Sequence, residues 1–282
     1  MKRVSKEWWV ARDGRMEDRE RESRDWKPVS RRQPPVQAGR VNRQKLRGTR
    51  LCAWYDGAVK ANGEKTAILL GATGLVGGFC LRALVDDSRY TRVMLFGRRQ
   101  MPPVTRAKVW QRVADLGTLG AEDFHGADDI FIALGTTIRK AGAQAEFRRI
   151  DLELPLHLAA EALKAGAEQL VVVSSVGADP GSRNFYLRTK GELEREIAKL
   201  PFKAIHILRP SLLIGKRPEF RLGEAMAMWI APALDLLAFG PLRKYHSARV
   251  ETVGKAMVGA ARQGRTGTHI YEYDQIMALG SA

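Results

Sequence analysis

The stretch that decides the fold is TAILLGATGLVGG, residues 66–78. Its first five residues form a continuous apolar run, which is typical of a strand buried on both faces of a sheet. Apolar residues then recur at helical spacing from Leu75 to Leu84. We therefore predict a strand over 66–70, a tight turn, and a helix that ends near residues 86–88.

The turn contains glycines with the spacing G-x-x-G-x-x-G, at Gly71, Gly74 and Gly77. In a dinucleotide-binding unit the first glycine permits the tight turn, the second lets backbone N–H groups approach a pyrophosphate, and the third lets the helix pack closely on the sheet. The positive end of the helix dipole then faces the phosphates. Glycines alone would be weak evidence, but the flanking strand and helix supply the required context. The candidate cofactor-binding residues of this loop are Gly71, Thr73, Gly74, Leu75, Val76 and Gly77.

The second predicted strand, residues 92–96, is followed by Gly97-Arg98-Arg99. An NAD site would place an acidic residue here to hold the ribose 2′-hydroxyl, whereas an arginine suits the 2′-phosphate of NADP by charge and by its fork of donors. We therefore predict NADP(H) as the cofactor, with Arg98 and Arg99 as its ligands. The alternative is that both are solvated surface arginines.

Strands and helices continue to alternate along the chain. We predict strands over 108–113, 129–134, 169–173, 204–208 and 269–272, and helices over 143–165 and 250–261. Gly166 suits the end of the first helix, and Pro155 is expected to kink it. This alternation predicts an α/β fold, a Rossmann-type doubly wound parallel sheet. Strand ends add further cofactor-binding candidates: Asp115, whose carboxylate could meet an adenine amino group, Leu116, Leu134, Gly135 and Thr136.

The chemistry-bearing residues follow the strand over 169–173, which ends in Ser174-Ser175. Tyr186 and Lys190 are four residues apart and share a helical face. A tyrosine hydroxyl has a free pKa of ~10, and a lysine ammonium beside it lowers that pKa by stabilising the phenolate. A serine can hydrogen-bond a substrate oxygen. The spacing alone is also compatible with a tyrosine packed on a lysine stem, and which serine acts stays open.

Residues 66–275 together resemble the short-chain dehydrogenase/reductase superfamily in its atypical branch, near the Tat-interacting oxidoreductases and their bacterial relatives. The motifs are GATGLVG (71–77), FGRR (96–99), LGTT (134–137), FRRID (147–151), SSVGA (174–178), YLRTKGE (186–192) and LRP (208–210). The resemblance implies NADP(H) binding by the glycine loop and the two arginines. It implies Tyr186 as general acid/base, Lys190 as its activator and a ribose contact, and a serine that polarises the substrate. It also implies that residues 208–213, Leu213 included, line the nicotinamide end. Asp151 stands where the superfamily places an asparagine, which puts the usual proton relay in doubt.

Residues 1–60 carry 17 Lys and Arg against 8 Asp and Glu, so they hold +9 of the formal net charge of +16. They contain four tryptophans but neither strand alternation nor an apolar stripe. We expect a basic, disordered extension, or a start-site artefact with translation beginning near Val59. A basic arm for nucleic acid or a transit peptide are the alternatives, although the acids argue against the latter. We predict residues 61–282 as the NAD(P)-binding domain and expect no nucleic-acid binding by it.

The C-terminal third predicts a lid over about residues 211–246, which contains an apolar stretch over 225–240 rich in Met, Trp, Leu and Ala. The lid would pack over the cofactor and contribute to a homodimer interface. A membrane-surface helix is the alternative. Arg217, Arg221, Arg243 and Lys244 could attract an anionic substrate, or be solvated surface charge.

Composition excludes several classes. Apolar residues make up 45% and charged residues 28%, so the bulk is globular. Cys52 and Cys80 cannot form a disulfide framework, no Cys/His spacing suggests a metal, and no apolar run is long enough for a transmembrane segment. The expected location is the cytoplasm. We predict an NADP(H)-dependent oxidoreductase for a small carbonyl or alcohol substrate; the alternative is a non-catalytic NADP(H)-binding regulatory or redox-sensing protein.

Overall fold

The computed structural model describes residues 64–101, 107–214 and 245–281. The predicted N-terminal extension and most of the predicted lid, including Arg217, Arg221, Arg243 and Lys244, lie outside these ranges. Among the described residues, no helix combines the length and the apolar composition needed to cross a membrane.

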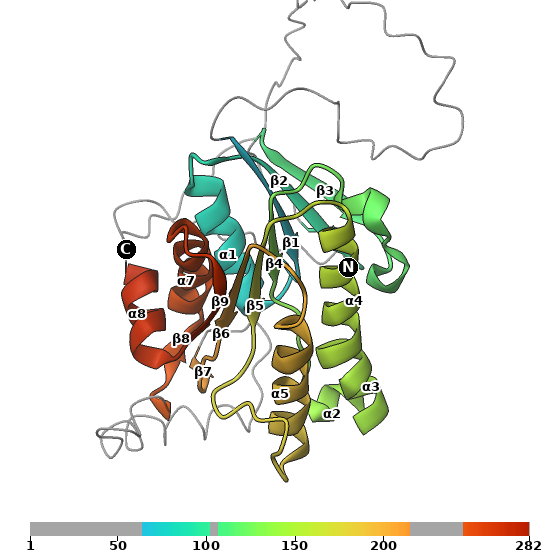
Figure 1. Cartoon of the computed structure of the whole chain (residues 1–282), viewed down its shortest axis with the longest axis vertical. Helices are drawn as coiled ribbons and strands as arrows, with labels where there is room; N and C mark the ends of the chain where they lie inside the picture. The colour runs from blue at the N-terminus through green and yellow to red at the C-terminus, as the bar shows by residue number, and fades with distance from the viewer. Residues whose placement is uncertain (1–63, 102–106, 215–244, 282) are drawn as a thin grey trace, which may run out of the picture. The chain divides into compact units, whose positions relative to one another are not determined.

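The described residues form a seven-stranded sheet in the order β3-β2-β1-β4-β5-β6-β9, with every neighbouring pair parallel. Strand order runs outward from β1 in both directions, so the sheet is doubly wound and its switch point lies between β1 and β4. The predicted fold class is confirmed (Figure 1). The strands are β1 Lys65–Leu70, β2 Tyr90–Gly97, β3 Val109–Val113, β4 Asp129–Ile132, β5 Gln169–Val173, β6 Ala204–Leu208 and β9 Gly267–Tyr271. A separate pair joins β7 Leu213–Ile214 to β8 Ala248–Arg249.

Helices cover both faces of the sheet (Figure 1). Alternate residues of β1 enter two cores, Ile68 and Leu70 on one face and Ala67 and Leu69 on the other. The first core is closed by α4 and α5, the second by α1 and α7. The helices are α1 Leu75–Asp86, α2 Ile138–Ala141, α3 Gln144–Arg148, α4 Leu154–Lys164, α5 Phe185–Ile197, α7 Val250–Arg262 and α8 Tyr273–Ser281.

The helix predicted over 143–165 is divided in three. A π-helical segment, Arg149–Glu153, separates α3 from α4. Pro155 lies in the first turn of α4, where it can neither donate a backbone hydrogen bond nor continue a regular helix from α3. The helix is thus interrupted next to the proline, as predicted. The interruption is a π-helical segment, and it buries Asp151, whose exposed fraction is 1%. The short α2, the two-stranded β7-β8 pair and α8 were not predicted.

Buried polar groups fasten the edge of the sheet where its strands begin. Asp129 is fully buried and accepts hydrogen bonds from Tyr90 Oη at 2.5 Å and from Lys65 Nζ at 2.9 Å. Nearby, Asp87 accepts from Arg89 Nη2 at 2.9 Å and from Arg262 Nε at 3.0 Å. Burial alone would raise the pKa of Asp87, but the hydrogen bonds from these two arginines outweigh it and lower the pKa to about 2. These groups leave the opposite edge, where the strands end, for the candidate site.

Candidate active site

The glycine turn after β1 has the geometry of a phosphate cradle. Gly71 has a φ of 96°, and a Cβ there would lie 2.5 Å from the carbonyl oxygen of Ala133 at the end of β4. A Cβ on Gly77 would lie 2.1 Å from the carbonyl oxygen of Gly71, so this glycine lets α1 pack on the turn itself. The first turn of α1 has no acidic residue. Because the first N–H groups of a helix lack helical acceptors, they remain available to an anion.

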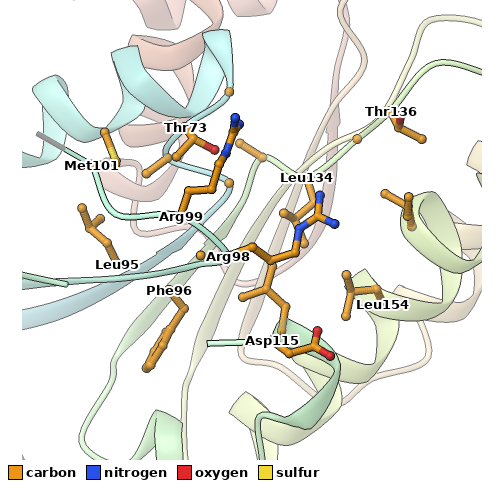
Figure 2. A pocket seen from close by; sticks show the side chains of 18 of the residues that line it. Thr73, Leu95, Phe96, Arg98, Arg99, Met101, Asp115, Leu134, Thr136 and Leu154 are labelled. Atoms are coloured by element: carbon orange, nitrogen blue, oxygen red, sulfur yellow. The ribbon is translucent and has the colours of Figure 1, made fainter. Parts of the chain in front are cut away.

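A cavity of about 500 Å³ opens beside this turn. Arg98 and Arg99 enter it from the loop after β2; in Figure 2 Arg99 lies on the side of Thr73 and Arg98 on the side of Leu134. Asp115 borders the cavity too, and its Oδ1 accepts the Gly117 N–H at 3.2 Å. Ten predicted cofactor residues come together here: Gly71, Thr73, Gly74, Arg98, Arg99, Asp115, Leu116, Leu134, Gly135 and Thr136.

Two further basic residues, Lys140 and Arg149, line the same cavity and were missed by the sequence reasoning. Lys140 follows the LGTT motif on α2, and Arg149 begins the π-helical segment. Arg149 is held by Glu146, which accepts from Nε at 2.8 Å and from Nη2 at 2.7 Å. The signal that could have found Arg149 is its place in the FRRID motif, two residues before Asp151.

Lys190 is buried on α5 and forms an ion pair with Asp151, with 2.7 Å between Nζ and Oδ1. The other oxygen of Asp151 accepts the backbone N–H of Thr136 at 2.8 Å. The Lys190 and Asp151 side chains are only 5% and 1% exposed. Asp151 therefore joins α5 to the cavity wall formed by the loop after β4.

Tyr186 lies one turn before Lys190 and is half-buried. Its ring packs against Phe147 of α3, with centroids 5.6 Å apart. Within residues 64–101, 107–214 and 245–281, the Tyr186 hydroxyl makes no hydrogen bond.

The structure separates the two serines at the end of β5. Ser174 is 5% exposed, and its hydroxyl donates to Glu194 Oε1. Ser175 is half-buried, and within the described part of the chain its hydroxyl makes a single long contact of 3.4 Å, with the Val176 carbonyl. Of the two predicted candidates, Ser175 is therefore the one with a hydroxyl available to a substrate.

The other predicted residues lie outside the cavity lining. Leu75, Val76 and Gly77 belong to the first turn of α1, and the lining includes none of them. Leu213 is 38% exposed on β7, where it pairs with Ala248. Ser174, Ser175, Tyr186 and Lys190 also lie outside the lining. Of these four, Lys190 is connected to the lining through Asp151, which accepts the backbone N–H of the lining residue Thr136.

Comparisons with known proteins place the chain in a family. No protein-family model matches it. Protein HTATIP2 of Rattus norvegicus is 34% identical over 223 residues, which is 77% of this chain and 90% of the relative. Protein fmp52, mitochondrial, of Emericella nidulans is 34% identical over 206 residues, 71% of this chain and 88% of the relative.

Solved structures agree in fold. MoeE5 in complex with UDP-glucuronic acid and NAD aligns with a TM-score of 0.56 at 18% identity, over 77% of this chain and 81% of that one. The oxidoreductase ylbE from Lactococcus lactis aligns with a TM-score of 0.54 at 16% identity, over 77% of this chain and 97% of that one.

The expectation of a cytoplasmic location is wrong by the same comparison. The FMP52 relatives of Emericella nidulans, Debaryomyces hansenii and Saccharomyces cerevisiae are all named mitochondrial. Reduced cysteines and the lack of a predicted transmembrane segment do not distinguish the cytoplasm from other reducing compartments, so the sequence argument could not decide the location.

The identity over most of both chains and the doubly wound fold agree, and the chain belongs to the HTATIP2 and FMP52 family of atypical short-chain dehydrogenases/reductases.

Proposed function

We propose that this protein is an NADP(H)-dependent oxidoreductase that acts on a carbonyl or alcohol, with Tyr186 as general acid/base. One observation carries the proposal: Asp151 contacts both Lys190 and the backbone of Thr136. The chemistry-bearing helix is thereby fastened to the wall of the cavity that holds the glycine turn. Ligands of doubly wound sheets bind at this carboxyl edge.

The cavity residues fit a phosphorylated dinucleotide. The glycine turn packs so closely on the backbone of Ala133 that Gly71 has no room for a Cβ. The start of α1 would supply backbone donors to a pyrophosphate. Arg98 and Arg99 stand where an acidic residue would select NAD, and they would pair with the 2′-phosphate. Bound NADPH supplies a hydride, and bound NADP⁺ accepts one.

The chain's own residues would handle the oxygen and the proton of the substrate. The Ser175 hydroxyl would hydrogen-bond the substrate oxygen, and the Tyr186 hydroxyl would deliver a proton to that oxygen during reduction and withdraw it during oxidation. The Lys190 ammonium would stabilise the phenolate of Tyr186 after proton transfer. Its ion pair with the buried Asp151, 2.7 Å from Nζ to Oδ1, would hold the Lys190 side chain in place for this role.

The same ion pair favours a second candidate function. Asp151 neutralises part of the charge of Lys190, which weakens its support of a phenolate. A non-catalytic NADP(H)-binding protein that senses the redox state would keep the cavity and need no proton transfer. This candidate predicts tight cofactor binding without turnover.

Calorimetry of the full chain with NADPH and NADH tests the cofactor proposal. Each charge-assisted hydrogen bond contributes about 1.5–3 kcal/mol, so Arg98→Ala/Arg99→Ala should weaken NADPH binding by at least ~10-fold and leave NADH binding nearly unchanged. The matched control is Arg195→Ala/Lys199→Ala, which removes two exposed charges near the end of α5. Equal NADPH binding by the wild type and the double variant would contradict the assignment of the arginines.

Turnover then separates the two functions. A panel of aldehydes and ketones is followed by the absorbance of NADPH, with wild type, Tyr186→Phe and Ser175→Ala. Loss of turnover in Tyr186→Phe with retained NADPH binding is the expected result. Tight binding by the wild type without any turnover would favour the sensor, and no cofactor binding by folded protein would refute both.

A further inference from the structure

A buried polar network lies beside the candidate site, at the carboxyl ends of β5 and β6. Glu194 of α5 is 7% exposed at its side chain, and it accepts three hydrogen bonds from Arg209, from Nε at 3.0 and 3.1 Å and from Nη2 at 2.5 Å. It also accepts the hydroxyl of Ser174. Arg209 directly follows β6 in the LRP motif (208–210). The family resemblance places this motif at the nicotinamide end, but the Arg209 side chain is bonded to Glu194, and the proposed function gives it no contact with the cofactor.

Backbone hydrogen bonds hold the neighbours of Ser175 on both sides. Ser174 N donates to Leu208 O at 2.7 Å, and Val176 N donates to Pro210 O at 2.9 Å. The chain beyond β6 is fixed in turn, because Arg209 N donates to Tyr271 O at 2.8 Å. Ser175 thus sits on a frame made by the ends of β5, β6 and β9.

Glu194 connects this frame to the chemistry-bearing face of α5. Tyr186, Lys190 and Glu194 follow one another at intervals of four residues, so they lie along one helical face. Among these three, Glu194 is the one bonded both to Ser174 and to Arg209, which directly follows β6. The ion pair with Arg209 therefore fixes α5 along its axis relative to Ser175.

We propose that Glu194 and Arg209 are positioning residues, which set the placement of Tyr186 relative to Ser175 through the bonds to Ser174 and to the end of β6. This inference rests on the proposed function. A purely stabilising role is the competing explanation. Burying two charges costs desolvation energy, and well-packed apolar residues in their place are often as stable or more stable. A need for stability therefore does not explain the ion pair, whereas a need to hold α5 at a fixed position relative to Ser175 does.

The test replaces both charges at once in the full chain, as Glu194→Met/Arg209→Met, so that neither partner is left as an unpaired buried charge. The matched control is Glu196→Gln/Lys199→Met, which removes a more exposed ion pair at the C-terminal end of α5, where Lys199 lies two residues beyond the helix. The double variant should keep its NADPH affinity within ~3-fold and lose kcat by ~10- to 100-fold, because small misplacements of reacting groups have effects of this size. KM should change much less. A stable double variant with wild-type kcat would refute positioning.

A second readout does not depend on turnover. With 3-fluorotyrosine at position 186 alone, the ¹⁹F resonance and its titration midpoint report the surroundings of this hydroxyl. We expect both to move in the double variant and to stay unchanged in the control, and an unchanged resonance and midpoint would overturn the proposal. If the wild type shows no turnover, the proposed oxidoreductase function fails, yet the fluorine titration still decides the positioning role. If the double variant does not fold, Glu194→Asp keeps the charge and shortens the side chain, and wild-type kcat and fluorine titration in that variant would refute the proposal.

Discussion

The ion pair between Asp151 and Lys190 gives the most direct test of the site geometry. The substitution Asp151→Asn keeps the shape of the side chain but removes its charge and one of its two acceptors. In the structure the two oxygens serve different donors, Lys190 Nζ at 2.7 Å and Thr136 N at 2.8 Å. Asparagine has one acceptor oxygen, so either the ammonium or the amide of Thr136 faces an NH₂ group.

The magnitude follows from burial. Breaking a buried ion pair on one side costs about 3–5 kcal/mol, because the remaining charge stays buried and unpaired. Asparagine can still satisfy one donor, so we expect the lower value, about 3 kcal/mol. For a domain of this size 1 kcal/mol corresponds to about 2–4 °C in Tm, which gives a fall of roughly 6–12 °C.

Thermal and urea unfolding of the full chain at neutral pH measure this difference. Glu161→Gln is the matched control, since it removes the half-buried partner of the exposed Lys164 on α4 and should cost at most about 1 kcal/mol. Adding Lys190→Met to Asp151→Asn removes the orphaned charge and should restore part of the loss. A Tm of Asp151→Asn within the spread of the control would show that the pair is solvated in solution, and the argument that Asp151 fastens α5 to β4 would fail.

Three further predictions concern stability. Gly71→Ala should lower both stability and NADPH affinity, since its φ is 96° and its Cβ meets backbone, whereas Gly78→Ala, whose Cβ meets only ordinary contacts, should change neither by calorimetry. Asp87 has a pKa of about 2 in the folded protein and ~3.9 in the unfolded chain, so it contributes about 2.5 kcal/mol to stability above pH ~4, and this contribution is lost as the pH falls towards ~2. In urea unfolding, the difference in unfolding free energy between the wild type and Asp87→Asn should therefore shrink on acidification. A difference that stays constant with pH would contradict this. Burial lowers the pKa of His206 to about 4, below its unfolded value of ~6.5, so the unfolded chain binds the extra proton and wild type should lose about 2 kcal/mol from pH ~7 to pH ~5. His206→Leu should flatten that slope, and an equal slope in both proteins would refute the assignment.

Strands of the sheet could be predicted closely from the sequence. The runs over 169–173 and 204–208 coincide with β5 and β6, because continuous apolar runs between polar residues leave few alternatives to a buried strand. The helix over 143–165 was predicted without its π-helical segment. The local sequence pattern could not predict that segment, because the segment places Asp151 against Lys190 on another helix and Thr136 in the loop after β4.

The candidate site shows the same division between local and long-range information. Glycine spacing and the arginines after β2 were visible in the sequence because each belongs to one local motif. The choice between Ser174 and Ser175 was not, because it is made by Glu194, twenty residues away. Lys140 and Arg149 likewise reach the cavity only through the path of the chain around α2 and α3.

Two buried carboxylates anchor α5 at successive turns. Asp151 ties Lys190 to the end of β4, and Glu194 ties the next turn to the ends of β5 and β6. Tyr186 lies one turn before the first anchor and is held by ring packing on Phe147 rather than by a hydrogen bond. The helix is therefore fixed at Lys190 and Glu194, and it is less constrained at Tyr186, where the proposed function requires the hydroxyl to meet a substrate. Under the proposed function, a protein that only bound the dinucleotide would need the anchor at Asp151, which contacts the cavity-lining residue Thr136, whereas the second anchor at Glu194 would serve the placement of Tyr186. The comparison of Asp151→Asn with Glu194→Met/Arg209→Met thus separates residues that serve the cofactor cavity from residues that serve proton transfer.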